Sequence, residues 1–167
     1  MPKTLTQFIA DVRSALSDPE SPADQRQAGT VMAAYLADPA FLQEISAQCD
    51  GPRTLLHEDS LRHFCVVTHR FEGAKTGEPH DHGATWSIYG QVSGVTHMVD
   101  YDVRQAPGPD ADGLVTPRRE YAMHPGDVHL YLLGDVHRPS RTATTQLLRL
   151  EGVNMVRMPR PKYRIAD

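Results

Sequence analysis

The sequence predicts a mainly β fold of the α+β class, with a helical cap at residues 1–50 and a β barrel or sandwich at residues 51–167. The composition changes at this boundary, because the first 50 residues contain nine of the sixteen alanines, one of the twelve glycines and none of the nine histidines. A chain of 167 residues with 40% hydrophobic content is enough for one substantial core and too short for two ordinary domains. We therefore expect the cap and the barrel to form one domain.

Three helices are predicted in the cap. Between Leu5 and Leu16, hydrophobic residues recur at spacings of three and four, which places them on one face of a helix. The pairs Ser21-Pro22 and Asp38-Pro39 each combine an N-cap residue with a proline in the first turn, so each predicts the start of another helix. Gly51-Pro52 ends the third helix. We expect these helices to pack on the outside of the barrel.

From residue 52 onward, short segments rich in β-forming residues alternate with turn residues, at intervals typical of a sandwich or barrel. A long loop is expected from Pro107 to Pro117, and the basic tail that contains Arg160 is expected to be solvated. The predicted strands are Arg53–His57, Arg62–His69, Ala84–Val92, Val95–Val103, Arg119–His124, Val128–Leu132 and Thr144–Glu151.

Composition also excludes several classes of partner. Lys and Arg total 17 against 21 for Asp and Glu, a net charge of -4, so the chain lacks the basic surplus of a nucleic-acid-binding protein. No hydrophobic run approaches the roughly 18–20 residues that span a bilayer, and the first residues lack the core of a signal peptide. Cys49 and Cys65 form no CxxC pair or disulfide framework. We expect a cytoplasmic protein with reduced cysteines and neither a nucleic-acid nor a membrane partner.

The strongest chemical motif is the segment PHDHG at residues 79–83. Residues two apart on a strand face the same side, so His80 and His82 point together while Asp81 points away. Two imidazoles on one face provide half of a metal site. A lone HxH pattern is a weak signal, and a second segment strengthens it.

That second segment spans residues 125–137. It begins with a PGD turn, continues as a strand that contains His129, turns again at Gly134 and then reaches His137. It therefore offers two histidines that could complete a metal site with the HxH pair.

With these two segments the sequence resembles the cupin superfamily, whose small double-stranded β-helix (RmlC-like) barrels belong with the jelly rolls. The first cupin motif is a glycine, then HxH, then a glycine after the next strand, and the second is PGD followed by a glycine turn and a histidine. The matching positions are Gly77, His80, His82 and Gly94 for the first motif, and residues 125–127, Gly134 and His137 for the second. This resemblance implies that His80, His82 and His137 bind a metal ion, because the third ligand of the family follows the turn whereas His129 lies within the strand.

Most metal-binding cupins add a glutamate four or five residues after the second histidine, where this chain has Trp86 and Ser87. In lacking this glutamate the sequence resembles the cysteine dioxygenase (thiol dioxygenase) group, whose iron is held by three histidines alone. The helices before the barrel and Arg53 at the first strand extend the resemblance, since that group uses an arginine there to hold the substrate carboxylate. The resemblance implies Fe(II) as the cofactor, although nothing in the ligand set excludes nickel, zinc or manganese.

Two departures from that group change the expected pocket. Ser87 stands where animal members carry a cysteine that is cross-linked to a tyrosine, so this thioether cannot form. The late strand of the group presents Ser-x-His-x-Tyr, and the best register places Arg149 at the histidine and Glu151 at the tyrosine. If both side chains point inward, they form a buried charge pair that could position a carboxylate or relay a proton, and the alternative is a purely structural ion pair.

Alternation along the strand at residues 84–92 turns Thr85, Ser87, Tyr89 and Gln91 towards the barrel interior, and Trp86 and Ile88 to the opposite face. We expect the other histidines, including His69, to lie at the surface or behind the ligands. The candidate catalytic residues are Arg149, Glu151 and Tyr89. The candidate substrate-binding residues are Arg53, Ser87, Gln91, Trp86 and His129.

Three imidazoles leave a divalent ion with its full charge and up to three open positions, which suits an anionic, chelating substrate and dioxygen. We therefore expect a mononuclear non-haem Fe(II) dioxygenase that acts with O2 on a small thiol or carboxylate-bearing substrate. The alternatives are a cupin isomerase or lyase with a redox-inert metal, and a non-catalytic cupin that binds a small molecule. A homodimer is expected by resemblance alone.

Overall fold

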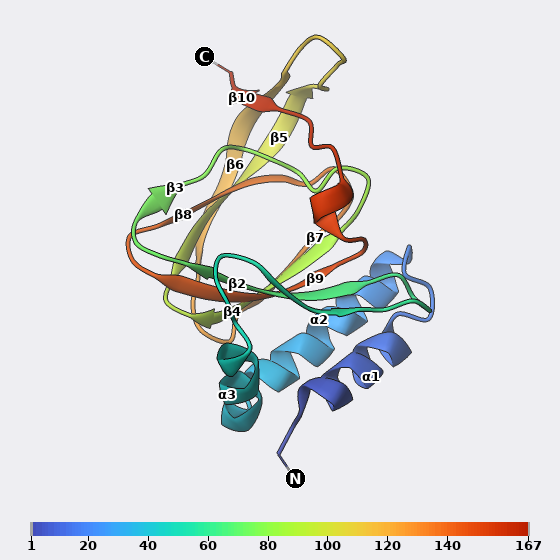
Figure 1. Cartoon of the computed structure of the whole chain (residues 1–167). Coiled ribbons are helices and arrows are strands. Elements are labelled where there is room, and N and C mark those ends of the chain that lie inside the picture. Colours follow the sequence, from blue (N-terminus) through green and yellow to red (C-terminus); the bar gives the residue numbers. More distant parts are fainter. Residues whose placement is uncertain (1, 167) are drawn as a thin grey trace.

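The protein, described here by a computed structural model for residues 2–166, consists of two β sheets that face each other and three helices beneath one of them (Figure 1). Each sheet has five strands within the described residues. The open end of the barrel faces the viewer in Figure 1, and the C-terminal segment runs up one side of it towards the top of the view. Among residues 2–166, no helix combines the length and the apolar character needed to cross a membrane.

The three predicted helices are confirmed as α1 (Leu5–Ala15), α2 (Pro22–Leu36) and α3 (Pro39–Ala47). The side chains of Thr4, Ser21 and Asp38 accept hydrogen bonds from backbone N–H groups in the first turns. These bonds satisfy donors that have no partner within the helix, and proline in the first turn of α2 and α3 sacrifices no helical hydrogen bond. The local sequence therefore specifies where each helix begins.

The strands of the first sheet form a continuous antiparallel array. In order across the sheet, they are β1 (Thr54–Glu58), β2 (Cys65–Phe71), β9 (Thr145–Glu151), β4 (Ser87–Ser93) and β7 (Val128–Tyr131), and the strands of the second sheet also follow in spatial order. The second sheet comprises β10 (Tyr163–Ile165), β6 (Gly113–Met123), β5 (Thr96–Gln105), β8 (Val136–Arg141) and β3 (Lys75–Thr76). Strand β10 pairs with β6 in parallel.

Three strands, β3, β8 and β10, were not predicted, and β6 begins at Gly113, so the loop predicted from Pro107 to Pro117 is too long. Proline explains two of these errors, because it removes a ladder donor and usually argues against a strand. Pro117 lies where the β5–β6 register shifts, which is a bulge position that tolerates proline. Pro139 lies within β8, where its carbonyl accepts a hydrogen bond from the Gly77 N–H.

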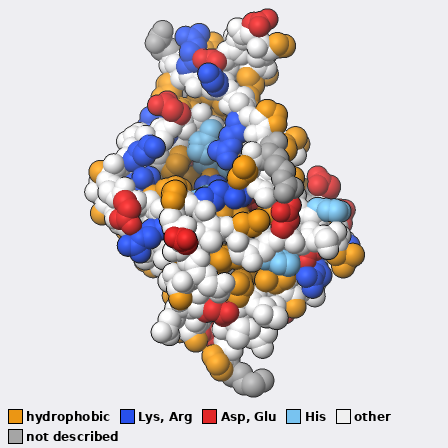
Figure 2. Space-filling view, viewed as in Figure 1, with side chains coloured by type: hydrophobic (Ala, Val, Ile, Leu, Met, Phe, Trp, Pro, Cys, Tyr) orange, Lys and Arg blue, Asp and Glu red, His pale blue; other side chains and the backbone are white. Residues whose placement is uncertain are grey.

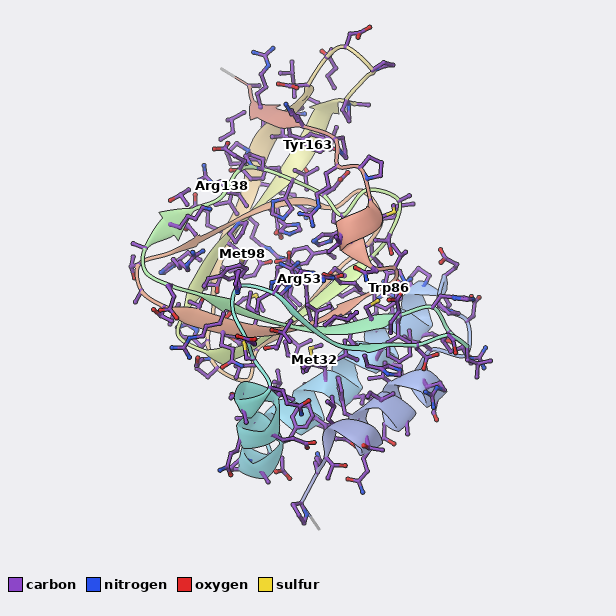
Figure 3. The ribbon with its side chains drawn as sticks, in the orientation of Figure 1. Met32, Arg53, Trp86, Met98, Arg138 and Tyr163 are labelled. Carbon is purple, nitrogen blue, oxygen red and sulfur yellow. The ribbon has the colours of Figure 1, made fainter. Side chains whose placement is uncertain are left out.

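The first sheet separates two cores. On its outer face, Val66, Ile88, Leu148 and Leu150 pack with the three helices. The sheet and α2 approach closely at Gly90, where an added Cβ would lie 2.6 Å from the Met32 Sδ atom. On the inner face the buried cluster consists of Tyr89, Met98, Met123, Tyr131 and Leu147. Figure 3 shows Met98 and Arg53 on the barrel side of this sheet and Met32 on the helix side.

Candidate metal centre and its cavity

The backbone brings His80 and His137 together across a short antiparallel bridge. The His80 N–H donates to the His137 carbonyl and the His137 N–H to the His80 carbonyl, both at 2.9 Å. His82 follows two residues later, and its ring centroid lies 4.8 Å from that of His137. One ring nitrogen from each of the three histidines lies within 4.8 Å of the others. The structure therefore assembles the predicted ligand set, which we call the histidine group.

Hydrogen bonds fix the tautomers of two of these rings. The Nδ1 atom of His80 lies 2.9 Å from the Glu78 carbonyl, and that of His137 lies 3.2 Å from the Asp135 carbonyl. A carbonyl can only accept, so each Nδ1 carries the proton and each Nε2 keeps its lone pair. The third ring offers its Nε2 atom 3.0 Å from the Tyr89 hydroxyl. These lone pairs are the ones that a metal ion requires.

Burial keeps all three imidazoles neutral. It is the largest influence on each, and it lowers the pKa of His80 to about 4 and the pKa values of His82 and His137 well below the usual value. The positive charge of Arg149 lowers all three further. Neutral imidazole is the form that binds metals, so the residues fit a divalent cation. Within the described part of the chain, no carboxylate belongs to the group.

Tyrosines form one side of this site. The Tyr89 hydroxyl also lies 3.3 Å from the His137 Nε2 atom, so it is within hydrogen-bonding distance of two ligands. The Tyr131 ring stacks on the His137 ring with centroids 3.8 Å apart. His129 packs against the Tyr131 ring at 4.5 Å and is not part of the histidine group. Of the two candidates for the third ligand, the structure therefore favours His137.

A cavity of about 450 Å³ opens beside the histidine group. Its charged lining residues are all basic, and Figure 2 shows Lys and Arg side chains around the histidines in the hollow. Four predicted site residues, Arg53, His80, Tyr89 and Arg149, line it. Other lining residues are His69, Phe71, Lys75, Arg141, Thr145 and Arg160.

Arg149 and Glu151 are buried side by side on β9, as alternation along the strand predicts. Glu151 is completely buried, and one of its oxygens lies 2.9 Å from the Arg53 Nη2 atom. The other lies 3.5 Å from the Arg149 Nη1 atom. The Arg149 guanidinium also lies over the Tyr89 ring, 4.1 Å from its centroid. One carboxylate therefore holds two arginines at the wall of the cavity.

Four predicted substrate-binding residues, Ser87, Gln91, Trp86 and His129, do not line this cavity. The Ser87 hydroxyl donates to the Leu150 carbonyl, and the Gln91 amide donates to the carbonyls of Ser93 and Gly94. Trp86 belongs to the helix-side core and borders a separate hollow near the start of α2. Its outward position on β4 follows from the same alternation that turns Tyr89 inward, so assigning Trp86 to the substrate pocket is incorrect.

His69 also lines the cavity, which the sequence did not predict. This residue is 5% exposed, and its Nδ1 atom lies 2.9 Å from the Pro52 carbonyl, which leaves Nε2 without the proton. Burial, followed by the charge of Arg149, lowers its pKa to about 2. It lies opposite Leu147 in the β2–β9 pairing, so alternation along β2 is the signal that could have found it. Arg160, expected to be solvated, also borders the cavity.

No family model matches this sequence. No curated protein matches it either. Among solved structures, hydroquinone 1,2-dioxygenase PnpCD in complex with Cd2+ and 4-hydroxybenzonitrile is similar with a TM-score of 0.50 and 14% identity, over 81% of this chain and 80% of that one. A cupin superfamily protein from Desulfitobacterium hafniense has a TM-score of 0.45 and 12% identity, over 61% and 76%. A cupin-2 domain protein from Shewanella frigidimarina has a TM-score of 0.45 and 12% identity, over 65% and 87%.

At these identities the likeness concerns the fold. The two facing sheets have the arrangement of a jelly roll, and the dioxygenase structure with the TM-score of 0.50 shares this fold. The chain therefore has a jelly-roll fold with a three-histidine group beside a basic cavity.

Proposed function

We propose that this protein is a mononuclear non-haem Fe(II) dioxygenase of the cysteine-dioxygenase-like type, acting on a small thiol or carboxylate-bearing substrate. The observation that carries the proposal is the histidine group, three neutral imidazoles without a carboxylate ligand at the end of a cavity whose charged lining is basic. Such a site favours an anionic ligand that can also coordinate the metal. The dioxygenase among the structural neighbours supports the proposal only in that a similar fold houses this class of reaction.

His80, His82 and His137 would hold the metal ion through their ring nitrogens. When bound there, Fe(II) supplies a Lewis acid with open coordination positions and the one-electron chemistry that zinc lacks. Nickel, zinc and manganese would fit the same donors.

The remaining roles fall to side chains of the cavity wall. Arg149 would bind the substrate carboxylate, because a planar guanidinium matches a carboxylate with two parallel hydrogen bonds. Glu151 orients this guanidinium and that of Arg53 through its two oxygens. The Tyr89 hydroxyl lies 3.0 Å from the His82 Nε2 atom. It would stay protonated and donate a hydrogen bond to the bound substrate. Together these contacts would fix the reacting atom beside the metal.

The test is dioxygen consumption by protein that has been loaded anaerobically with Fe(II), measured against thiol acids, diketones and hydroxylated aromatic acids. We expect uptake that requires iron and one substrate class, and no uptake with Zn(II)-loaded protein or with His82→Ala. Turnover that needs no oxygen and proceeds with zinc or manganese would instead show a redox-inert cupin enzyme. Ligand-dependent stabilisation without turnover would show a binding module.

A further inference from the structure

We propose that the substrate is an elongated dianion that spans the cavity, with one anionic group beside the histidine group and Arg149 and the other between Lys75 and Arg141. The inference rests on the proposed function only in assigning the ligand of this cavity as the substrate. It extends that proposal from a substrate with one negative group to a substrate with two.

The strand register separates two basic ends. On β8, His137 and Arg141 are four residues apart and share a face, which corresponds to about 13 Å at roughly 3.3 Å per residue. Lys75 is the cross-strand partner of Arg141 in the β3–β8 pair. On β9, Arg149 lies at the histidine end and Thr145 lies four residues nearer the opposite end. The cavity therefore runs along the strands from a metal-binding end to a second cationic end, formed by Lys75 and Arg141.

The second cationic end is an unfavourable arrangement without a ligand. Like charges directly opposite each other on neighbouring strands destabilise a sheet. Among residues 2–166, no carboxylate lies within ion-pair distance of Lys75 or Arg141. The nearby Glu72 is occupied by the Arg70 Nε atom at 2.7 Å and by the Thr144 hydroxyl at 2.9 Å. An anionic ligand group is the partner that this end lacks.

Arg141 is also held in position. Its Nε atom donates to the Gly73 carbonyl at 2.9 Å, and its guanidinium lies over the Phe71 ring, 4.9 Å from the centroid. These contacts use one edge and one face of the guanidinium and leave the two terminal nitrogens for a ligand. A fixed guanidinium loses less conformational entropy when it binds a carboxylate or phosphate.

Polar atoms in the lining between the two ends also lack partners. The atoms His69 Nε2, Arg149 Nε, Thr96 Oγ1 and Thr145 Oγ1 are buried and have no hydrogen-bond partner among the described residues. Buried polar groups of native proteins are nearly always paired, so these atoms indicate a polar ligand or its water. Because His69 Nε2 can only accept, it favours a ligand that carries an O–H, N–H or S–H group between its two anions.

A carboxylate, a phosphonate and a phosphate would share this chemistry, so the probes must separate them. Zn(II)-loaded protein is titrated calorimetrically with glutarate and adipate, with pentanoate and hexanoate as monoanions of the same chain lengths, and with 3-phosphonopropionate. We expect each dianion that fits to bind at least tenfold more tightly than its monoanion. Whichever of glutarate and 3-phosphonopropionate binds more tightly identifies the anionic group that Lys75 and Arg141 prefer.

The variant that tests the second end combines Lys75→Gln and Arg141→Gln. We expect it to weaken dianion binding at least tenfold and monoanion binding less than twofold, with an unchanged circular dichroism spectrum. Arg104→Gln is the matched control, since Arg104 is exposed on β5 and bonds Thr116 far from the cavity lining. An Arg141→Lys variant retains the charge and should retain part of the preference for dianions over monoanions.

Equal affinity for dianions and monoanions, no binding of any dianion at millimolar concentration, or an unchanged preference in the double variant would each overturn the inference. Because the titrations use zinc, they do not depend on oxygen chemistry. Dianion selectivity without iron-dependent oxygen uptake would leave this inference intact and remove the dioxygenase proposal. Oxygen uptake with a monoanionic substrate whose KM is unchanged in the double variant would leave the dioxygenase proposal intact and remove this inference.

Discussion

Replacing Glu151 by glutamine should destabilise the protein strongly, although the two side chains have nearly the same shape. Glu151 is completely buried and faces two guanidiniums, with Oε2 2.9 Å from Arg53 and Oε1 3.5 Å from Arg149. The same Oε2 atom accepts a hydrogen bond from the Met155 N–H at 3.2 Å. Glu151→Gln removes the negative charge between the two guanidiniums and leaves their positive charges without it.

The size of the effect follows from burial. Removing one partner of a buried ion pair typically costs about 3–5 kcal/mol. The Arg53 side chain is 25% exposed and can regain water, and glutamine can still accept from it, so the lower end of that range applies. We expect a loss of about 3 kcal/mol in the free energy of unfolding. For a chain of this length, that corresponds to a fall of about 6–12 °C in the melting temperature.

Urea denaturation followed by circular dichroism would measure this loss, with Glu72→Gln as the matched control. Glu72 also pairs with an arginine, but its side chain is 69% exposed and that of Arg70 is 53% exposed. An exposed ion pair is screened by water and contributes little to stability, so the control should unfold at the same urea concentration as the wild type. A Glu151→Gln variant as stable as this control would refute the argument that the carboxylate neutralises two buried cations.

Other predictions concern the ligands, the tyrosine and one turn. Tyr89→Phe should keep one metal ion per chain but lower kcat for oxygen uptake at least tenfold, and an unchanged kcat would show that its hydroxyl takes no part. The metal-free protein should lose stability as the pH falls from about 6.5 to about 4, because the folded pKa of His80 is lowered to about 4 and the unfolded chain binds more protons in that window. The titration of His80 alone lowers the free energy of unfolding by about 3 kcal/mol over that range. Equal urea midpoints at pH 7.5 and 5 would contradict this prediction. Gly94→Ala should cost at least about 1–2 kcal/mol, because φ is +70° and the new Cβ would lie 2.5 Å from the Thr144 carbonyl oxygen. An unchanged denaturation midpoint for that variant would show that the turn relaxes without strain.

Features governed by local sequence could be predicted well. Helix starts depend on an N-cap side chain and a proline within a few residues, as at Ser21-Pro22. The inward direction of Tyr89 and Arg149 follows from strand alternation, and the two residues are cross-strand partners in the β4–β9 pair. The histidine group was predicted because the cupin resemblance supplied the link between His82 and His137, which spacing alone does not provide.

Features that depend on pairing between distant segments were missed. The pairing of β3 with β8 places Lys75 opposite Arg141, although 66 residues separate them in the chain. Likewise, Arg160 reaches the cavity from a tail that β10 attaches to β6. Local patterns contain no information about such contacts, so the second basic end of the cavity becomes visible only in the folded structure.

The most direct test of the central claim is the metal content of four variants after Fe(II) loading and dialysis under anaerobic conditions. We expect one metal ion per chain in the wild type and in His129→Ala. The variants His80→Ala, His82→Ala and His137→Ala should each lose stoichiometric metal while their circular dichroism spectra stay unchanged. Stoichiometric metal in His137→Ala together with its loss in His129→Ala would contradict the assigned ligand set and the function proposed from it.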